Sequence, residues 1–205
     1  MYSFIVLASI IGFLAYLAWQ RRSPRPFPPW MTPVLHSPLR RRNFSPEVAA
    51  GRHGVASGMT VLEVGPGDGY LTVAAADRTS PGGRLICLDL QLAMLRKLRK
   101  ALGVRTPPLV CASGSQLPFR ANAFDLVFLS QVLGEIPDRT GALSEYARVL
   151  RPSGTLAITE GLPDPDFIRC ARLVRMARGA GFRPAERFGR TFYYTQRFYL
   201  GGGAA

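Results

Sequence analysis

The sequence has few of the residues that bind metals or form disulfides. It contains two histidines, His36 and His53, and three cysteines, Cys87, Cys111 and Cys170. No cysteines are spaced as a C-x-x-C metal site, and neither histidine has a Cys or His partner at ligand spacing. We therefore expect no metal site and no disulfide framework, with reduced cysteines in the protein core and histidines in loops.

Acidic residues are also scarce, with 13 Asp and Glu against 26 Lys and Arg, which gives a formal net charge of +13. Such an excess indicates either nucleic-acid binding or contact with an anionic membrane. Between Arg21 and Arg52, seven arginines accompany a single acid, Glu47. Because this basic segment directly follows an apolar stretch and no nucleic-acid motif accompanies it, the pattern favours a membrane surface and no nucleic acid.

The apolar stretch covers residues 1–20, which contain no charged side chain. As a helix, residues 1–19 would extend about 28 Å, close to the hydrocarbon thickness of a bilayer. Trp19 lies at the end of the stretch and Arg21 follows, which predicts a single-pass membrane anchor with the following domain in the cytoplasm. A cleaved signal peptide is the alternative, but the basic residues lie after the apolar run and not before it.

Composition divides the remaining chain into three parts. Residues 21–44 are rich in proline and arginine and predict a semi-rigid juxtamembrane tether. Residues 45–200 have the length of one domain with a single core. Residues 201–205 contain only glycine and alanine and predict a flexible tail.

Apolar runs alternate with helix-like segments through most of this domain. The predicted strands are 60–64, 84–89, 109–112, 124–130 and 155–159. The predicted helices are 70–78, 91–102 and 140–150, with stop signals at Gly103 and at 151–154. This alternation predicts an α/β fold in which helices cover both faces of a parallel sheet and the ligand binds at the carboxyl ends of the strands.

The end of the domain predicts one more helix and a hairpin. The helix spans residues 164–179, and its apolar face consists of Phe167, Ala171, Val174 and Ala177. Four arginines lie elsewhere on it: Arg169, Arg172, Arg175 and Arg178. We expect these arginines to form a solvated face, with contact to anionic lipid as the alternative. Two apolar or aromatic runs, 183–188 and 191–200, predict the hairpin.

A glycine-rich segment follows the first predicted strand. Gly65, Gly67 and Gly69 alternate with Pro66 and Asp68, and a predicted helix follows. Glycines in this arrangement allow a tight turn and a close approach of the backbone to a ligand at the start of a helix. Dinucleotide enzymes use a related loop, but its spacing is G-x-G-x-x-G, whereas here it is G-x-G-x-G with an acid, Glu63, two positions before it.

An acid also ends the second predicted strand, twenty residues after Gly69. The Asp89 carboxylate can accept two hydrogen bonds from the hydroxyls of a ribose, as an adenosine-containing cofactor in this geometry requires. The alternative role for Asp89 is the N-cap of the helix that begins near Gln91.

Two later motifs complete a family resemblance. They are Leu117-Pro118-Phe119, with Phe124-Asp125-Leu126-Val127 after it, and Arg148-Val149-Leu150-Arg151-Pro152-Ser153-Gly154. With the glycine loop and Asp89, their order and spacing resemble class I S-adenosylmethionine-dependent methyltransferases, particularly the methyltransferase-11 and ubiquinone/menaquinone methyltransferase-like group, over about residues 45–195. The resemblance implies S-adenosyl-L-methionine as cofactor and a Rossmann-like, seven-stranded, mostly parallel sheet with an antiparallel C-terminal strand.

The resemblance also implies cofactor contacts at the carboxyl ends of the strands. Glu63 and the loop glycines would lie around the methionine part, Asp89 would bind the ribose, and Leu90 would contact the adenine. Ser113 stands where the family usually has an aspartate near the adenine amino group. Gly114 follows it, so this contact would rest on a hydroxyl or on the backbone.

The same resemblance places Ser130 and Gln131 against the cofactor beneath its sulfonium. Glu135 and Glu160 are candidates for a catalytic or substrate-orienting carboxylate, although Glu135 could equally cap a helix. No His or Lys is evident as a general base. We therefore expect a methyltransferase that acts on a small or lipid-soluble acceptor, such as a quinone precursor, a lipid or a thiol. The alternatives are an NAD(P)-binding Rossmann oxidoreductase and a non-catalytic, membrane-tethered methyltransferase-like domain.

Overall fold

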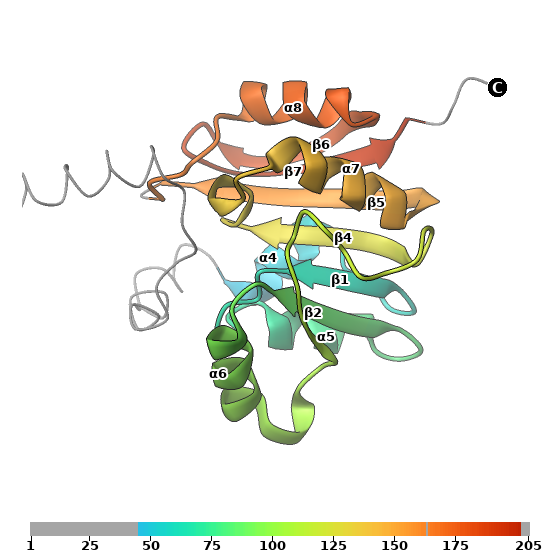
Figure 1. Cartoon of the computed structure of the whole chain (residues 1–205), viewed down its shortest axis with the longest axis vertical. Helices are drawn as coiled ribbons and strands as arrows, with labels where there is room; N and C mark the ends of the chain where they lie inside the picture. Colours follow the sequence, from blue (N-terminus) through green and yellow to red (C-terminus); the bar gives the residue numbers. More distant parts are fainter. Residues whose placement is uncertain (1–44, 163, 202–205) are drawn as a thin grey trace, which may run out of the picture.

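The computed structural model describes residues 45–162 and 164–201 of the chain. The predicted anchor, tether and most of the tail lie outside these residues. Within them, seven strands form one sheet in the order β3-β2-β1-β4-β5-β7-β6 (Figure 1). Strands β1 to β5 pair in parallel, and β7 lies antiparallel between β5 and β6. The predicted Rossmann-like, mostly parallel sheet with an antiparallel C-terminal strand is confirmed.

The strands at the centre of the sheet are apolar runs that are buried on both faces, whereas the edge strand β6 is mostly exposed. Their bounds are β1 Thr60–Val64, β2 Arg84–Asp89, β3 Leu109–Cys111, β4 Phe124–Ser130, β5 Leu150–Gly161, β6 Phe182–Arg190 and β7 Tyr193–Leu200. Side chains alternate between the faces, so Leu62 and Val64 enter one core while Val61 enters the other. The near-continuous burial of β1 and β4 is what a parallel strand covered by helices on both sides requires.

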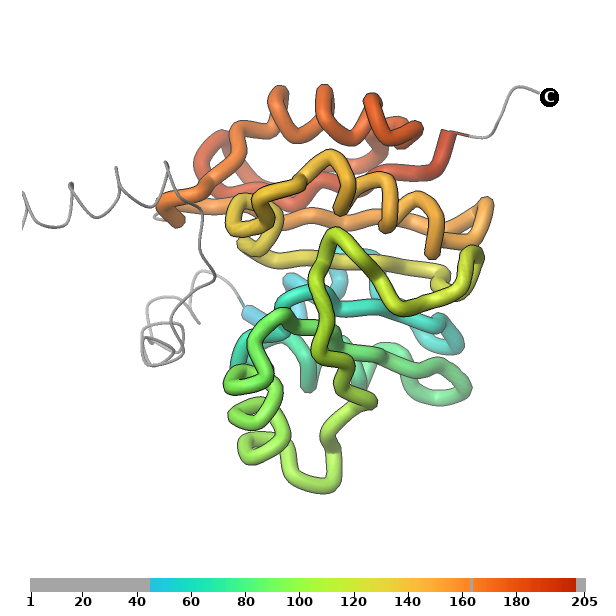
Figure 2. The backbone as a smooth tube through the Cα atoms, viewed as in Figure 1, coloured from blue at the N-terminus to red at the C-terminus, as the bar shows by residue number. Residues whose placement is uncertain are grey.

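Helices cover both faces. They are α4 Pro46–His53, α5 Thr72–Thr79, α6 Leu92–Leu102, α7 Arg139–Val149 and α8 Cys170–Gly179, with short 3-10 helices η2 Gly103–Arg105 and η3 Leu133–Glu135. Ala49, Ala75 and Leu98 place α4, α5 and α6 in one core, whereas Tyr146 and Leu173 place α7 and α8 in the other. The chain path in Figure 2 shows α7 and α8 on the same side of the sheet.

Strand β5 begins earlier than the sequence predicts. Residues 151–154 do end helix α7, but they are already extended and belong to the strand. Leu150 pairs with Phe124, and the register shifts before Thr155 pairs with Leu126. The proline and glycine of this segment are tolerated because they lie at the irregular start of the strand and not in its regularly paired part.

Helix α4 was not predicted, and one histidine prediction was wrong because of it. The Ser45 hydroxyl accepts a hydrogen bond from Val48 N, and Pro46 occupies the first helical turn. The helix places His53 in the core, where its ring stacks on Phe128 at a centroid distance of 4.7 Å. His53 is therefore a buried helical residue and not a loop residue, and burial lowers its pKa to about 3.

The prediction for the last helix was wrong at its start and at one residue of its apolar face, since Phe167, Val174 and Ala177 do pack against the core. The Asp164 carboxylate accepts a hydrogen bond from Asp166 N, so these residues form a local turn, and α8 starts only at Cys170. The residues that α8 buries are Leu173 and Ala177, while Ala171 is exposed. None of the helices in the described part of the chain has the length and apolar character needed to cross a bilayer.

The cysteines share their oxidation state but not their location. All three are free thiols. Cys87 is buried in the core as predicted, whereas Cys170 is half-buried and Cys111 is exposed. The core prediction was wrong for Cys111 because β3 is the edge strand of the sheet and its last residue is open to solvent.

Candidate cofactor and acceptor site

Strand register gathers most of the predicted site residues at one edge of the sheet. Val64 pairs with Leu88 on β2 and with Leu129 on β4, so Gly65, Asp89 and Ser130 are neighbours at the carboxyl ends. The strand order reverses direction between β1 and β4. Ligands of open α/β sheets bind at such a switch point.

The three loop glycines have left-handed backbones but different surroundings. Their φ angles are +71° at Gly65, +60° at Gly67 and +99° at Gly69. A Cβ atom at Gly65 would lie 2.5 Å from Val132 Cγ2, and one at Gly69 would lie 2.5 Å from Leu98 Cδ1. At Gly67 no heavy atom lies within 4 Å. Side chains therefore pack closely against Gly65 and Gly69, whereas the space beside the Gly67 backbone is open.

Asp89 is buried beside this loop. It is 8% exposed, and its Oδ1 accepts a hydrogen bond from Gln91 N at 2.8 Å. Burial raises the pKa of Asp89, and hydrogen bonds from the backbones of Gln91 and Gly67 oppose that shift. The N-cap position of α6 belongs to Gln91, so Asp89 is not the N-cap that the alternative required. The hydrogen bond from the Gly67 backbone holds the Asp89 carboxylate next to the open part of the glycine loop.

Glu63 lies beneath the glycine loop. It is 3% exposed, and its Oε2 accepts a hydrogen bond from Thr72 Oγ1 at 2.8 Å and is 3.5 Å from the Cys87 thiol. Burial raises the pKa of Glu63 to about 7. Glu63 therefore links β1 to the first residue of α5. Thr72 makes this link and is not among the predicted site residues, although its hydroxyl stands just after the glycine loop in the sequence.

The predicted adenine side combines an open apolar residue with a local hydroxyl pair. Leu90 is 58% exposed, as a residue that stacks on a ligand can be. Ser113 Oγ lies 3.0 Å from Ser115 Oγ and accepts a hydrogen bond from Ser115 N. Gly114 is closely packed, because a Cβ there would lie 3.0 Å from Ile136 Cδ1. The adenine roles of these residues stay predictions.

The end of β4 carries an unsatisfied hydroxyl. Ser130 Oγ is buried and has no hydrogen-bond partner within the described residues. Gln131 follows with a φ of +58°, and its Nε2 donates to Gly161 O at 3.0 Å. The Gln131 side chain thus connects the end of β4 to the end of β5 by a hydrogen bond. The buried Ser130 hydroxyl is unpaired within the described residues, and a ligand could provide its hydrogen-bond partner.

Glu160 lies on the opposite face of the sheet from Glu63. It is fully buried near the end of β5, and its Oε2 accepts a hydrogen bond from Ile168 N at 3.0 Å. The structure gives Oε1 no partner among residues 45–162 and 164–201. Burial raises the pKa of Glu160 to about 8, with Asp164 and Asp166 adding to the effect and Arg139 opposing it. At neutral pH this side chain is mostly a neutral acid.

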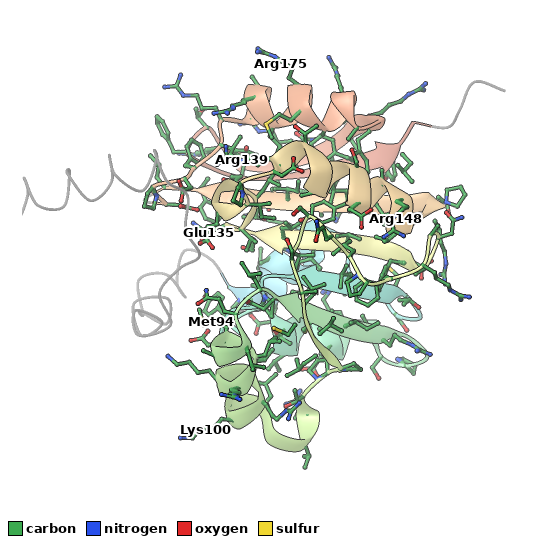
Figure 3. The ribbon with its side chains drawn as sticks, in the orientation of Figure 1. Met94, Lys100, Glu135, Arg139, Arg148 and Arg175 are labelled. Atoms are coloured by element: carbon green, nitrogen blue, oxygen red, sulfur yellow. The ribbon has the colours of Figure 1, made fainter. Side chains whose placement is uncertain are left out.

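Glu135 ends η3 and is half-buried. In Figure 3 it lies at the edge where β4 ends, whereas Arg148 lies toward the opposite edge. Helix α7 is capped by Asp138, whose Oδ1 accepts a hydrogen bond from Gly141 N at 2.8 Å. Glu135 is therefore not the cap of α7, and a contact with an acceptor stays a prediction for it.

The two later sequence motifs contact each other away from this edge. Arg148 donates to Phe119 O at 2.7 Å and to Leu117 O at 3.1 Å, and it pairs with Glu145. These groups border a surface depression that none of the predicted cofactor residues lines. The glycine loop and its neighbouring strand ends are the better candidate site, because the buried unsatisfied hydroxyl and the open glycine backbone lie there. The later motifs hold the β3–β4 connection against α7.

Comparisons with known proteins identify a matching family for the part of the chain that contains this edge. Residues 62–158, nearly half of the chain, match the sequence model of a family described as a methyltransferase domain. This region contains the loop, Asp89 and Ser130.

Three curated relatives are methyltransferases by name. Nocamycin O-methyltransferase of Saccharothrix syringae is 32% identical over 54% of this chain and 40% of its own length. Demethylmenaquinone methyltransferase of Corynebacterium urealyticum is 39% identical over 48% of this chain and 44% of its own. The ubiquinone/menaquinone biosynthesis C-methyltransferase UbiE of Bordetella parapertussis is 37% identical over 54% and 43%. The chain spans less than half the length of these relatives.

Solved structures share the fold. A SAM-dependent methyltransferase from Aquifex aeolicus has a TM-score of 0.76 at 22% identity, over 85% of this chain and 99% of its own. The PH0226 protein from Pyrococcus horikoshii has a TM-score of 0.67 at 16% identity, over 80% of this chain and 92% of its own. At these identities the likeness concerns the fold alone.

Proposed function

We propose that this chain is an S-adenosylmethionine-dependent methyltransferase. The observation that carries the proposal is the convergence of Gly67, Asp89 and Ser130 at the switch point of the sheet, inside the region that matches the methyltransferase domain. The names of the curated relatives support the same reaction class.

The polar groups at this edge fit the proposed cofactor. The open Gly67 backbone would lie against its methionine part, the Asp89 carboxylate would accept hydrogen bonds from its ribose, and Ser130 Oγ would gain the partner that it lacks. Exposed Leu90 would cover the adenine. When bound, the cofactor supplies an electrophilic methyl group on a sulfonium.

The residues of this chain would mainly align the acceptor and exclude water, since displacement at a sulfonium needs little acid–base chemistry from the protein. Glu160 is mostly protonated at neutral pH and would donate a hydrogen bond to an acceptor oxygen more readily than it would remove a proton. Glu135 is the other carboxylate that we propose for contact with the acceptor. An acceptor that is acidic in itself suits such a site best.

The acceptor that we propose is small or lipid-soluble, such as a quinone precursor, a lipid or a thiol. One of the relatives is named for demethylmenaquinone and another for ubiquinone/menaquinone biosynthesis. We further propose that residues 1–20 anchor the chain in a membrane, that residues 21–44 act as a tether and that the domain lies in the cytoplasm, because an uncharged stretch precedes a basic one. Tethering would raise the effective concentration of a membrane-dissolved acceptor.

Calorimetry of the full chain with S-adenosylhomocysteine and with NADH tests the cofactor. We expect binding of S-adenosylhomocysteine only. Binding of NADH instead would favour the oxidoreductase alternative, and binding of neither would favour a non-catalytic domain.

The acceptor is tested by incubation with methyl-labelled S-adenosylmethionine and isolated membranes. Label in an extractable lipid or small-molecule fraction is the expected result. Label confined to protein would contradict the proposed acceptor class. A chain that lacks residues 1–20 and still remains in carbonate-washed membranes would contradict the anchor.

A further inference from the structure

Positive charge is unevenly distributed along the chain. Residues 45–168 contain twelve Lys and Arg and twelve Asp and Glu, so this part is formally neutral. Residues 169–200 contain eight arginines and one acid, Glu186. The excess charge of the described domain therefore belongs entirely to its C-terminal elements.

Seven of these eight arginines lie on the outside of the domain, whereas Arg197 is half-buried and donates hydrogen bonds to Gly51 O and Arg52 O. Helix α8 packs over β6 and β7 at the periphery of the molecule (Figure 1), with Leu173 and Ala177 buried beneath it. Its outer side carries three exposed arginines and its N-cap, Arg169, a fourth, and Arg175 points away from the domain in Figure 3. Strand β6 adds three more. We call this set the arginine surface: Arg169, Arg172, Arg175, Arg178, Arg183, Arg187 and Arg190.

The α8 part of this surface is the informative part. Charges on an edge strand such as β6 also prevent pairing with other strands, so the β6 arginines have a structural explanation. The three α8 arginines and Arg169 at the N-cap have no such role, and the described residues give none of them an acidic partner. They form an unneutralised cationic face that an anionic partner would complement.

An exposed apolar pair lies at the end of the same elements. Leu162, just after β5, is 46% exposed, and Phe192, in the turn between β6 and β7, is 64% exposed. Leu162 N donates to Phe192 O at 2.8 Å, which holds the two residues side by side. This apolar tip is two residues from Glu160, at the carboxyl edge of the sheet.

We propose that the arginine surface and the apolar tip form a contact with anionic phospholipid membranes. The guanidinium groups would bind lipid phosphates, and Leu162 and Phe192 would enter the headgroup region, as amphipathic interfacial surfaces do. A nucleic acid would use the arginines but not the apolar tip, so a membrane fits both features. The contact would turn the carboxyl edge toward the bilayer. It does not depend on the cofactor or on the anchor.

The test measures the tip itself in the full chain. An environment-sensitive fluorophore is attached to Phe192→Cys in a Cys111→Ser, Cys170→Ser background, and phosphatidylcholine vesicles with and without phosphatidylserine are added. We expect a blue shift with the anionic vesicles only. An anchor elsewhere in the chain would bind both vesicles and would not by itself shift a fluorophore at position 192.

Matched charge reversals identify the surface. The double variant Arg172→Glu, Arg175→Glu on α8 should abolish the blue shift. The control is Arg96→Glu, Lys100→Glu at exposed positions of α6, which changes the net charge equally and should leave the blue shift unchanged. The milder pair Arg172→Gln with Arg175→Gln should reduce the shift and guards against misfolding of the first pair. Three outcomes would overturn the proposal. The two charge reversals could have equal effects, the fluorophore could show no shift with anionic vesicles, or a short DNA duplex could produce the shift instead. S-adenosylhomocysteine binding in the same samples reports separately on the proposed function.

Discussion

Two parts of one sheet differ in what they offer a partner. Residues 45–168 carry balanced charge, and their strand ends present a glycine loop, a buried aspartate and an unsatisfied hydroxyl. Residues 169–200 continue the same sheet with β6 and β7 but present arginines and an exposed aromatic residue. Under our two proposals the first part binds a small ligand and the second contacts a membrane surface, so substitutions in one part should leave the property of the other unchanged.

The largest effect is expected at Gly65. Gly65→Ala combines a left-handed backbone with a Cβ 2.5 Å from Val132, and should lower the free energy of unfolding by about 2–4 kcal/mol and abolish S-adenosylhomocysteine binding. Gly67→Ala adds only backbone strain and should lower the free energy of unfolding by about 1–2 kcal/mol. It should also abolish S-adenosylhomocysteine binding, because its methyl group enters the open space beside the loop. Urea unfolding and calorimetry measure the two quantities.

The control for this pair comes from the other part of the molecule. Gly181 has a φ of +86° and open space around its Cβ position, so Gly181→Ala should cost as much stability as Gly67→Ala. The affinity of Gly181→Ala for S-adenosylhomocysteine should remain that of the wild type. Equal loss of affinity at positions 67 and 181 would show that Gly67 acts through stability alone.

Asp89→Ala should weaken S-adenosylhomocysteine binding at least about tenfold, because hydrogen bonds to a charged group are lost. Asp89→Asn keeps the shape and one acceptor oxygen and should have a smaller effect. Asp77→Ala removes an exposed aspartate that pairs with Arg105 on the outer surface, and should leave affinity unchanged. Unchanged affinity in Asp89→Ala would contradict the ribose assignment.

Glu160 should make stability depend on pH. Its pKa is raised from 4.5 to about 8 in the folded protein, so the folded state binds the extra proton. That stabilisation is complete below the unfolded value and is lost as the pH rises toward the folded value. Between about pH 5 and about pH 8, the wild type should therefore lose about 2–4 kcal/mol more of its unfolding free energy than Glu160→Gln.

Chemical denaturation of both proteins at the two pH values checks this prediction. Glu186→Gln, at the exposed acid of the basic part, serves as the control and should follow the wild type. If Glu160→Gln also follows the wild type, the carboxyl is not the proton-binding group.

The sequence-based predictions were accurate where the pattern is local and wrong where a competing turn or a distant contact decides the structure. Strands β1, β2 and β4 were predicted with their observed bounds, because each is an apolar run that ends at a glycine, an acid or a polar pair. The start of α8 was wrong, since a turn around Asp164 competes locally with the helix. The burial of His53 was not predictable, because its partner Thr159 lies 106 residues away. Contacts between residues so far apart in the sequence depend on the order of the strands in the sheet. The local sequence pattern does not specify that order.

The smallest effect is expected at two buried hydroxyls, one in each part. Ser130 Oγ has no partner within the described residues, whereas Thr195 Oγ1 lies 2.7 Å from Thr159 Oγ1. Thr195→Val should therefore cost about 1 kcal/mol of stability and leave ligand affinity unchanged, because it breaks an existing hydrogen bond.

Ser130→Ala should do the reverse. Its stability should stay within about 0.5 kcal/mol of the wild type, because no hydrogen bond is lost in the free protein. Its affinity for S-adenosylhomocysteine should fall about three- to tenfold, the effect of one hydrogen bond formed only with the ligand. If Ser130→Ala loses stability but not affinity, the hydroxyl serves the fold, and the ligand-binding part would no longer include the end of β4.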